Sequence, residues 1–262
     1  MLTFVGLGLY DERSITVQGR DAIRSADRVF AEFYTSKLAG ATLEAVEQYH
    51  NTDIEVRSRE GVEQHPEPIL DAAEAGEAVF CTAGDTMIST THVDLRLRAH
   101  ERGIDTRVVH GTTAEAAASS LTGLQNYRFG KATTLPFESS HGGEGVPDSM
   151  VETIEANRER GLHTLIFLDI KVDDEREDYM SATQAAELLS THWEAETLAV
   201  VVGQAGSDAP VVTADTLDNL AAQTYGDPLH MLVVPGSLHY IERDALVELA
   251  GAPTDAADSL LV

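Results

Sequence analysis

Three glycine-containing turns, each at the end of a short apolar run, constrain the fold of this chain most strongly. They span residues 6–13, 81–87 and 203–208. An apolar run that ends in glycine and is followed by a helical pattern predicts a parallel strand leading into a loop and a helix. Ligands of open α/β sheets bind beyond the carboxyl ends of the strands. The three turns therefore predict a small-molecule site built largely from backbone groups.

The same turns lack the two common phosphate-binding patterns. The first turn has no third glycine at the spacing of a dinucleotide fingerprint, and none of the three carries Gly-Lys-Ser/Thr. We therefore expect the chain to bind an organic cofactor without either of these devices.

Strand and helix patterns alternate along the chain and predict an α/β fold with two domains. The first half is typical of a parallel, doubly wound sheet. We place the domain boundary after His110, so that residues 1–110 and 111–262 each form an α/β domain, with a cofactor cleft between them. The predicted strands span residues 2–9, 28–33, 53–57, 77–82, 105–109, 131–135, 164–170, 197–202 and 230–234. Helices are predicted over 16–26, 42–49, the stretch up to 75, 90–102, 114–121, 148–160, 183–193, 216–223 and 241–249, with a polar loop at 138–147 and an acidic loop after 170.

The charge balance is strongly acidic. The 262 residues include 44 acids and 18 bases, which gives a net charge of -26, and the only lysines are Lys37, Lys131 and Lys171. Self-repulsion of this size destabilises a compact chain at low salt, and acids spread along the whole sequence indicate a protein of a high-salt cell. An acidic face for a basic partner is the alternative. The absence of a basic stripe argues against direct nucleic-acid binding.

Several features predict a cytoplasmic protein. No apolar stretch approaches the ~20 residues of a membrane helix, and the chain starts directly with a strand pattern, so we expect no signal peptide. The single cysteine, Cys81, suits a reducing compartment. Because Cys81 lies within an apolar run, we interpret it as a small buried hydrophobe rather than a nucleophile.

A few polar residues are candidates for chemistry. Asp11 and Glu12 follow the first strand and either cap the next helix or contact a ligand. Asp85, expected on a solvent-facing loop, either contacts a ligand or closes an Asx-turn. His230 is either a buried structural histidine or a cofactor contact, and the sequence favours neither. The histidines show no metal-ligand spacing, and no Gly-x-Ser-x-Gly elbow is present.

Several runs of residues carry a resemblance to a known family: 6–16, 31–36, 84–85, 90–98, 123–131, 161–171, 205–207, 225–230 and 234–236. Taken together, these runs resemble the diphthine synthases of haloarchaeal type, a family in the tetrapyrrole-methylase-like class of methyltransferases. The resemblance extends over nearly the whole chain in order, which makes it far more specific than one glycine motif.

The resemblance implies a function. The methyl donor would be S-adenosylmethionine, bound in the cleft between the two α/β domains, and the enzyme would be a homodimer. The acceptor would be the amino group of the 3-carboxy-3-aminopropyl side chain on a histidine of translation elongation factor 2. Three methylations would yield diphthine, an intermediate of diphthamide. The cofactor contacts carried over are Leu9, Asp85, Ile88, Thr113, Ala114, Leu168, Ala205 and His230.

Two alternative functions stay open, and the sequence departs from the usual pattern of the family at three places. The chain could be a small-molecule methylase acting on a porphyrin-like ring, or a non-catalytic module that binds a regulatory nucleotide. Thr86 replaces a common proline, residues 111–113 replace an Ala-Pro-Ser type of turn, and Gln204 replaces a frequent arginine. The last change removes a positive charge near the expected cleft. No general base is predicted.

The charge generates a prediction about salt. The midpoint of thermal unfolding should rise by many degrees between 0.1 M and 2 M KCl, because the Debye length falls from about 10 Å at 0.1 M to about 3 Å at molar salt. Calorimetry across this range measures the shift. An unchanged midpoint would contradict the high-salt interpretation and favour the basic partner.

Overall fold

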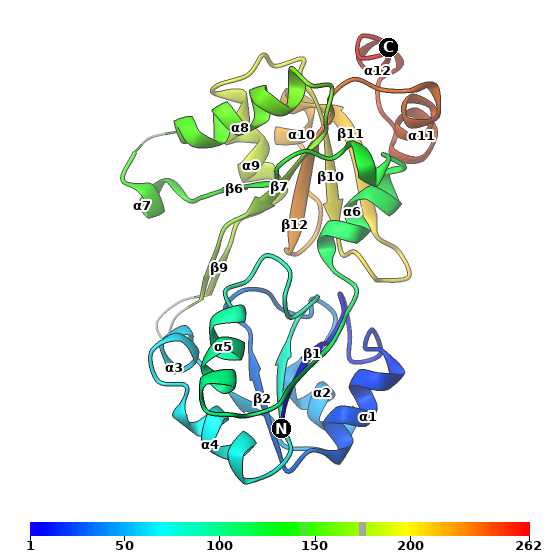
Figure 1. The fold of residues 1–262 in the computed structure, drawn as a ribbon. Helices are drawn as coiled ribbons and strands as arrows, with labels where there is room; N and C mark the ends of the chain where they lie inside the picture. The colour runs from blue at the N-terminus through cyan, green and yellow to red at the C-terminus, as the bar shows by residue number, and fades with distance from the viewer. Residues whose placement is uncertain (144, 173–176) are drawn as a thin grey trace. The chain divides into compact units, whose positions relative to one another are not determined.

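The computed structural model describes residues 1–143, 145–172 and 177–262 (Figure 1). The chain divides into two compact units, Met1–Ala114 with Ile170–Glu177, and Glu115–Asp169 with Asp178–Val262. The predicted boundary after His110 lies in the connection that ends at Ala114. Assignment of Ile170–Glu177 to the first unit was not predicted. The predicted acidic loop includes residues 173–176, which lie outside the described residues.

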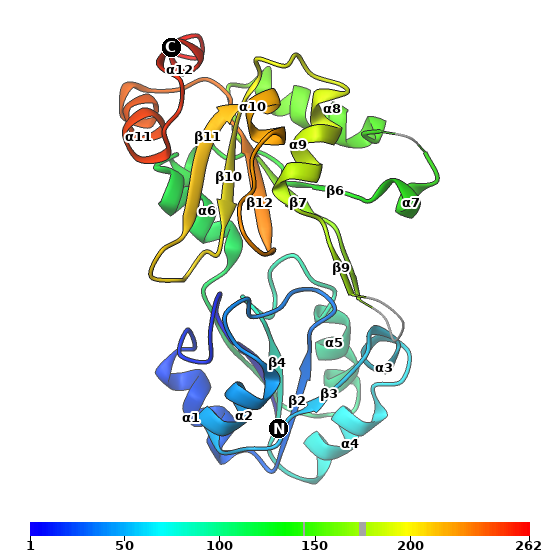
Figure 2. The same ribbon diagram turned by 180° about the vertical axis from the view of Figure 1, so that it is seen from behind.

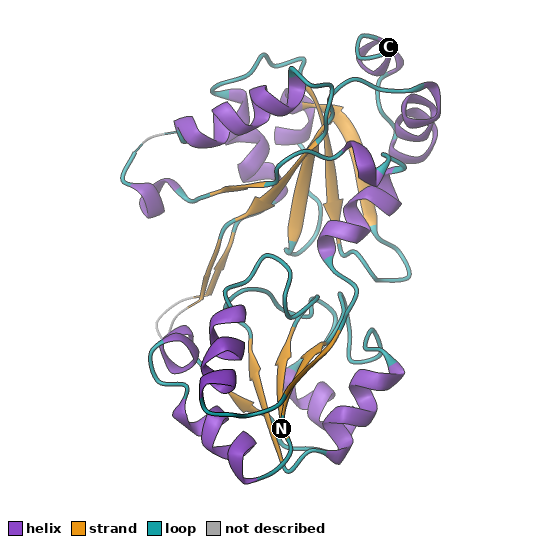
Figure 3. Cartoon of the chain, viewed as in Figure 1, coloured by secondary structure: helices purple, strands orange, loops and turns teal. Residues whose placement is uncertain are grey.

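The first unit contains a parallel five-stranded sheet with the order β3-β2-β4-β1-β5. Figure 3 shows its strands in orange, between helices in purple. The prediction of a parallel α/β sheet is confirmed. Strands β1 and β4 are fully buried, which explains why their sequences are almost unbroken apolar runs. The strands are β1 (Leu2–Gly6), β2 (Arg28–Glu32), β3 (Glu55–Val56), β4 (Ala78–Thr82) and β5 (Thr106–Val109).

Helices cover both faces of this sheet. Phe4 and Phe80 point to one face and pack with residues of α3, α4 and α5, whereas Val5 and Cys81 point to the other and pack with α1 and α2. This alternation follows from the two-residue period of a strand. The helices are α1 (Val17–Ser25), α2 (Leu43–His50), α3 (Arg59–Glu63), α4 (Glu67–Ala75) and α5 (Val93–Glu101).

The second unit contains a mixed five-stranded sheet with the order β11-β10-β12-β7-β6. Strands β6 and β7 are parallel, and the remaining pairs are antiparallel. Outside both five-stranded sheets, β8 and β9 form a separate two-stranded sheet, and β8 belongs to the segment Ile170–Glu177 of the first unit. The strands that follow β5 are β6 (Thr133–Leu135), β7 (Thr164–Leu168), β8 (Ile170–Val172), β9 (Glu177–Tyr179), β10 (Leu198–Gly203), β11 (Val211–Thr216) and β12 (His230–Val234).

The third glycine turn does not do what its pattern predicted. Gly203 ends β10, but β10 is antiparallel to both of its neighbours, and the chain returns along β11 instead of entering a helix. The expectation of a parallel strand was therefore wrong. Strand β11 was missed because Ala214 is its only buried residue, so its sequence lacks an apolar run.

The helices of the second unit pack mainly through α8, α9 and α10, which cover one face of the sheet (Figure 2). Within the predicted polar loop at 138–147, a short helix, α7, is present. In the described ranges, every helix is too short or too polar to cross a lipid bilayer. The helices are α6 (Ala114–Thr122), η1 (Asn126–Arg128), α7 (Glu138–His141), α8 (Asp148–Arg158), α9 (Ala182–Ser190), α10 (Leu217–Ala221), α11 (Tyr240–Ala250) and α12 (Thr254–Asp258).

A buried carboxylate ties α11 to the rest of the second unit. Glu242 accepts hydrogen bonds from the Gln125 and His239 backbone N–H groups at 3.0 and 2.9 Å and lies 3.1 Å from His163 Nε2. Arg128 Nη1 lies 3.4 Å from its other oxygen. Burial raises the pKa of Glu242, but these donors outweigh burial and leave the pKa below its ordinary value.

Replacing this carboxylate tests its contribution to stability. Glu242→Gln should lower the free energy of unfolding by about 3 kcal/mol near neutral pH, because the partners of a buried charge are left uncompensated. The parent's advantage should be present above the carboxyl's ordinary pKa and should disappear as the pH falls through its lowered native pKa. Chemical denaturation at several pH values measures both effects. Glu248→Gln, on an exposed position of α11, is the matched control, and equal losses in the two variants would contradict this role.

Candidate functional site

The ends of three strands meet through glycines at one edge of the first sheet. Gly8 and Gly84 form an antiparallel bridge, in which Gly84 N–H donates to the Gly8 carbonyl at 2.7 Å and Gly8 N–H to the Gly84 carbonyl at 3.2 Å. A Cβ atom on Gly111 would lie 2.2 Å from the Gly84 carbonyl oxygen, and one on Gly6 would lie 2.5 Å from Gly111 N. Glycine is required here because the backbones themselves are in contact.

Asp85 connects two of these strand ends. Its Oδ1 accepts a hydrogen bond from Met87 N–H at 2.9 Å, and its Oδ2 accepts one from Gly111 N–H at 3.2 Å and lies 2.8 Å from His110 Nδ1. The Asx-turn is thus present, but the side chain also reaches the loop after β5. Asp85 is only 5% exposed, so the expected solvent-facing position was wrong. The reason is the inward turn of the carboxylate toward Gly111.

The edge beside Asp85 keeps room for a ligand. Gly84 adopts a φ of +76°, and a Cβ atom built on it would meet no described atom within 4 Å. A carboxylate can accept about four hydrogen bonds, of which the neighbours named above supply three. The edge therefore combines free space, backbone groups and one acceptor position.

The other first-unit residues predicted to contact a cofactor lie at this same edge, three in loops and Ala114 at the start of α6. Leu9 follows β1, Ile88 follows β4, and Thr113 and Ala114 follow β5. Parallel strands place their carboxyl ends at one edge, which brings these loops together. Ile88 is 41% exposed, and the other three are half-buried.

Asp11 and Glu12 do not cap the following helix. The N-cap of α1 is Thr16, whose side chain accepts a hydrogen bond from Gly19 N–H. Asp11 instead closes a local turn, accepting from Arg13 N–H at 3.0 Å and from the Ser14 hydroxyl at 2.9 Å. The capping interpretation was therefore wrong, and Asp11 serves the shape of the first glycine turn.

The predicted residues of the second unit lie at one edge of its mixed sheet. Leu168 ends β7, Ala205 follows β10, and His230 begins β12. Because Gly203 pairs with His230 and Phe167 pairs with Met231, these three positions are near neighbours. The antiparallel arrangement thus places the end of β10 beside the start of β12.

His230 uses both ring nitrogens within the protein. Nδ1 accepts a hydrogen bond from Ala182 N–H at 3.2 Å, and Nε2 lies 3.1 Å from the Tyr225 carbonyl oxygen, to which it donates. Burial lowers the pKa of His230, which keeps this ring neutral. The interpretation as a buried structural histidine is therefore the one that the contacts favour. Cofactor contact through the ring carbons or backbone stays a prediction.

Two further observations concern Cys81 and Lys37. Cys81 is buried in the core, where burial raises the pKa of its thiol, so its interpretation as a buried hydrophobe is confirmed. Lys37 Nζ lies 3.9 Å from the Glu177 carboxylate, a partly exposed ion pair. Among the described residues, no group of three His, Cys, Asp or Glu side chains could hold a metal ion.

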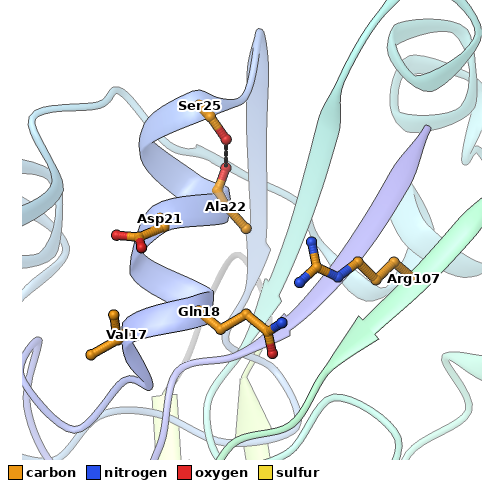
Figure 4. A pocket seen from close by; sticks show the side chains of 6 residues that line it. All are labelled: Val17, Gln18, Asp21, Ala22, Ser25 and Arg107. Carbon is orange, nitrogen blue, oxygen red and sulfur yellow. Dashed lines mark hydrogen bonds between the residues drawn. The ribbon is translucent and has the colours of Figure 1, made fainter.

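A surface pocket elsewhere in the first unit has a different character. It lies beside α1 and β5 and shares none of its lining with the predicted site (Figure 4). In Figure 4, Gln18 extends toward Arg107, while Val17 and Asp21 lie away from it. These side chains do not converge on one point, so the glycine edge remains the better candidate. The lining residues are Val17, Gln18, Asp21, Ala22, Ser25 and Arg107.

Sequence reasoning missed two buried polar residues near the glycine edge. Glu32 ends β2 and His92 immediately precedes α5, and both are almost completely buried. Each lies in one of the runs that resemble the methyltransferase family. The presence of a titratable residue in each of these two runs could have indicated a role for both, but a single sequence does not show that the two side chains lie close together.

Comparisons with known proteins settle the family. The model of the tetrapyrrole (corrin/porphyrin) methylases matches residues 1–221. The chain belongs to this family of methyltransferases. It is 70% identical over 259 residues to a diphthine synthase of Halobacterium salinarum, covering 98% of this chain and 100% of that protein. A diphthine synthase of Methanosarcina barkeri is 50% identical, with 97% of each chain covered.

A solved structure agrees with these sequence relatives. A crystal structure of diphthine synthase superposes with a TM-score of 0.89 at 36% identity and covers 98% of both chains. The resemblance inferred from the sequence is thereby confirmed, as is the fold class. Within the tetrapyrrole methylases, the chain groups with the diphthine synthases.

The glycine contact generates a prediction. Gly111→Ala should lower the free energy of unfolding by about 1–3 kcal/mol, because the new Cβ would overlap the Gly84 carbonyl and force the backbones apart. Chemical denaturation measures the change. Gly61→Ala, whose Cβ would lie 3.1–3.3 Å from the Arg57 guanidinium instead of overlapping backbone, is the control and should lose less stability. Parent-like stability of Gly111→Ala would show that the contact is not required.

Proposed function

We propose that this chain transfers methyl groups to the amino group of the 3-carboxy-3-aminopropyl-histidine of translation elongation factor 2, and so produces diphthine. The observation that carries this proposal is the 70% identity with a diphthine synthase across 98% of the chain. An identity of this size over nearly the whole of both proteins supports the view that the two share a methyl acceptor as well as a fold. Fold alone would not, because one fold hosts many functions.

We propose S-adenosylmethionine as the methyl donor, and the residues of the first unit fit such a molecule. The free space beside Gly84 and the backbone groups of the strand ends suit a flat, polar ligand. The remaining acceptor position of Asp85 suits a donated ribose or ammonium proton. The donor would contact Leu9, Asp85, Ile88, Thr113, Ala114, Leu168, Ala205 and His230. Its sulfonium supplies an already activated methyl group.

The chain's own contribution is to bind and to orient. Rigid backbone at Gly8, Gly84 and Gly111 fixes the glycine edge, and near-attack alignment of two reactants can supply roughly 7–11 kcal/mol. The apolar side chains Leu9, Ile88 and Leu168 exclude water from the contacts that they make. An α-amino group has a pKa of about 7.7–8.0, so a fraction of the acceptor is neutral without a dedicated base.

The same proposal includes the partners and the setting. Elongation factor 2 is the protein substrate, and the enzyme acts as a homodimer in the cytoplasm of a high-salt cell. The net charge of -26 supports this setting, and the relative that is 70% identical is a protein of Halobacterium salinarum. At least one of Lys37, Lys131 and Lys171 faces the cofactor cleft or the docking surface for elongation factor 2, because a chain that otherwise avoids lysine keeps these three in or next to runs that resemble the family.

Asp85 provides a test of donor binding. Asp85→Asn should weaken S-adenosylmethionine binding by roughly ten- to a hundredfold, because a charge-assisted hydrogen bond contributes ~1.5–3 kcal/mol and ~1.4 kcal/mol is tenfold. The amide keeps the size of the side chain and limits the damage to the Gly111 contact. Isothermal calorimetry measures the affinity, with Asp71→Asn, at an exposed position of α4, as the control. Parent-like affinity would withdraw Asp85 from the donor site.

The decisive assay uses labelled donor. The chain, labelled S-adenosylmethionine and archaeal elongation factor 2 carrying the 3-carboxy-3-aminopropyl group are incubated at high salt, and the modified peptide is identified by mass spectrometry. Methylation of that histidine is the expected result. The same factor with an unmodified histidine is the control and should stay unlabelled. Label that enters only small molecules of a cell extract would contradict the proposed acceptor.

A further inference from the structure

Glu32 and His92 form a buried pair beside the loop that carries Asp85. Their side chains are 0% and 1% exposed, and His92 Nε2 lies 3.6 Å from Glu32 Oε1. Glu32 ends β2, which pairs with β4, and the Asp85 loop follows β4. The pair therefore lies at the carboxyl edge of the sheet, one strand away from the glycine contact.

One side of the histidine ring holds the Asp85 loop. His92 Nδ1 lies 3.1 Å from the carbonyl oxygen of Thr86, the residue after Asp85. A carbonyl only accepts, so Nδ1 carries the hydrogen and donates it. The Thr90 hydroxyl donates to the same carbonyl at 3.2 Å. The backbone directly after Asp85 is thus held by two side-chain donors.

The other side of the ring faces a carboxylate that is itself fixed. Glu32 Oε2 accepts the Tyr34 and Thr35 N–H groups at 3.0 Å each, and Oε1 accepts the Thr35 hydroxyl. These three donors prevent the carboxylate from rotating away. The histidine ring is also held edge-on by Phe80 and by Tyr34, with ring centroids 5.1 and 6.5 Å away.

The closeness of Nε2 to the carboxylate limits the protonation states of the pair, although at 3.6 Å the two atoms are too far apart for a hydrogen bond and Nε2 has no hydrogen-bond partner among the described residues. With Nδ1 protonated, an unprotonated Nε2 would turn its lone pair toward an ionised Glu32, and two acceptors repel. A proton on either Nε2 or Glu32 removes the repulsion, and both forms leave the pair with no net charge, which lowers the cost of burial. Burial also lowers the pKa of His92 and raises that of Glu32. Arg59 and Glu63 are the neighbouring charges that act on the pair.

We infer that His92 is a positioning residue for donor binding: Glu32 orients its ring, and its Nδ1–H holds the Thr86 carbonyl so that residues 85–88 keep the conformation that contacts the donor. This role rests on the proposed function, because it needs that loop to bind S-adenosylmethionine. It assigns a role to the two sequence runs around Glu32 and His92, which resemble the family but contain no predicted cofactor contact. His92 itself touches neither donor nor acceptor in this account.

Three substitutions separate the two sides of the ring. His92→Asn places an amide N–H near the Nδ1 position, His92→Gln places one near the Nε2 position, and His92→Phe removes both. The dissociation constant of S-adenosylmethionine should rise about tenfold in His92→Phe, the equivalent of one lost hydrogen bond. It should rise as much in His92→Gln and recover toward the parent value in His92→Asn. In the methyl-transfer assay, kcat measured at saturating S-adenosylmethionine should change much less than the KM for S-adenosylmethionine.

Controls keep the test specific. His100→Asn, at an exposed position of α5, should bind the donor like the parent. A general loss of folding would lower kcat in all His92 variants without ranking Asn above Gln. Nitrogen-15 NMR of the parent provides a readout without any variant, since the assigned His92 ring should show a protonated Nδ1. An unprotonated Nδ1, or parent-like affinity in both His92→Phe and His92→Gln, would overturn the positioning role. A parent that binds no S-adenosylmethionine would overturn the proposed donor instead.

Discussion

The backbone contact among Gly6, Gly84 and Gly111 is the constraint on which the rest of the site depends. Three strand ends approach so closely that a Cβ atom on Gly6 or Gly111 would overlap neighbouring backbone. Side chains are therefore excluded from the point where an open α/β sheet ordinarily binds its ligand. Recognition falls to backbone groups and to the residues that hold the loops in place.

The residues that hold the loops, Asp85, His92 and Glu32, follow one another outward from that contact. Asp85 joins the loop after β4 to the loop after β5 through a partly buried hydrogen bond, and His92 holds the carbonyl of Thr86. The Glu32 carboxylate lies 3.6 Å from the other ring nitrogen of His92. The contact of His92 with Thr86 is buried, where a hydrogen bond is electrostatically stronger than in water. A rigid edge of this kind is suited to aligning a donor that needs little chemical activation.

Buried and exposed charges have different roles in this acidic chain. Surface pairs such as Arg98 with Asp94, at 2.7 Å, contribute little because water and salt screen them. The buried groups at Glu32 and Glu242 are few but fully surrounded by donors. Salt therefore acts on the surface repulsion, while the buried pairs define particular conformations. The two effects are separable by experiment.

Sequence patterns predicted the first unit well and the second less well, for physical reasons. Strands β1 and β4 are buried on both faces, so they read as apolar runs whose glycines mark their ends. Strand β11 is only partly buried, and an apolar run such as β10 does not encode the direction of its neighbours. Both features depend on tertiary pairing.

The candidate site was anticipated only in its placement. The loops that contain Leu9, Asp85 and Thr113 lie at one edge of the first sheet, because parallel strands bring their carboxyl ends together, whereas their contact with a cofactor stays a prediction. The depth of Asp85 depends on Gly111, which lies 26 residues away in sequence. The meeting of Glu32 with His92 likewise depends on the order of strands in the sheet. Neither contact leaves a local pattern.

Hydrogen–deuterium exchange with and without saturating S-adenosylmethionine tests the central claim most directly. The account predicts slower exchange of backbone amides in the loops 8–11, 84–88 and 110–114, with little change in the helices α1, α2 and α4 of the same unit. Unchanged exchange in all three loops, in a protein that calorimetry shows to be saturated with the donor, would contradict a donor site at the glycine edge.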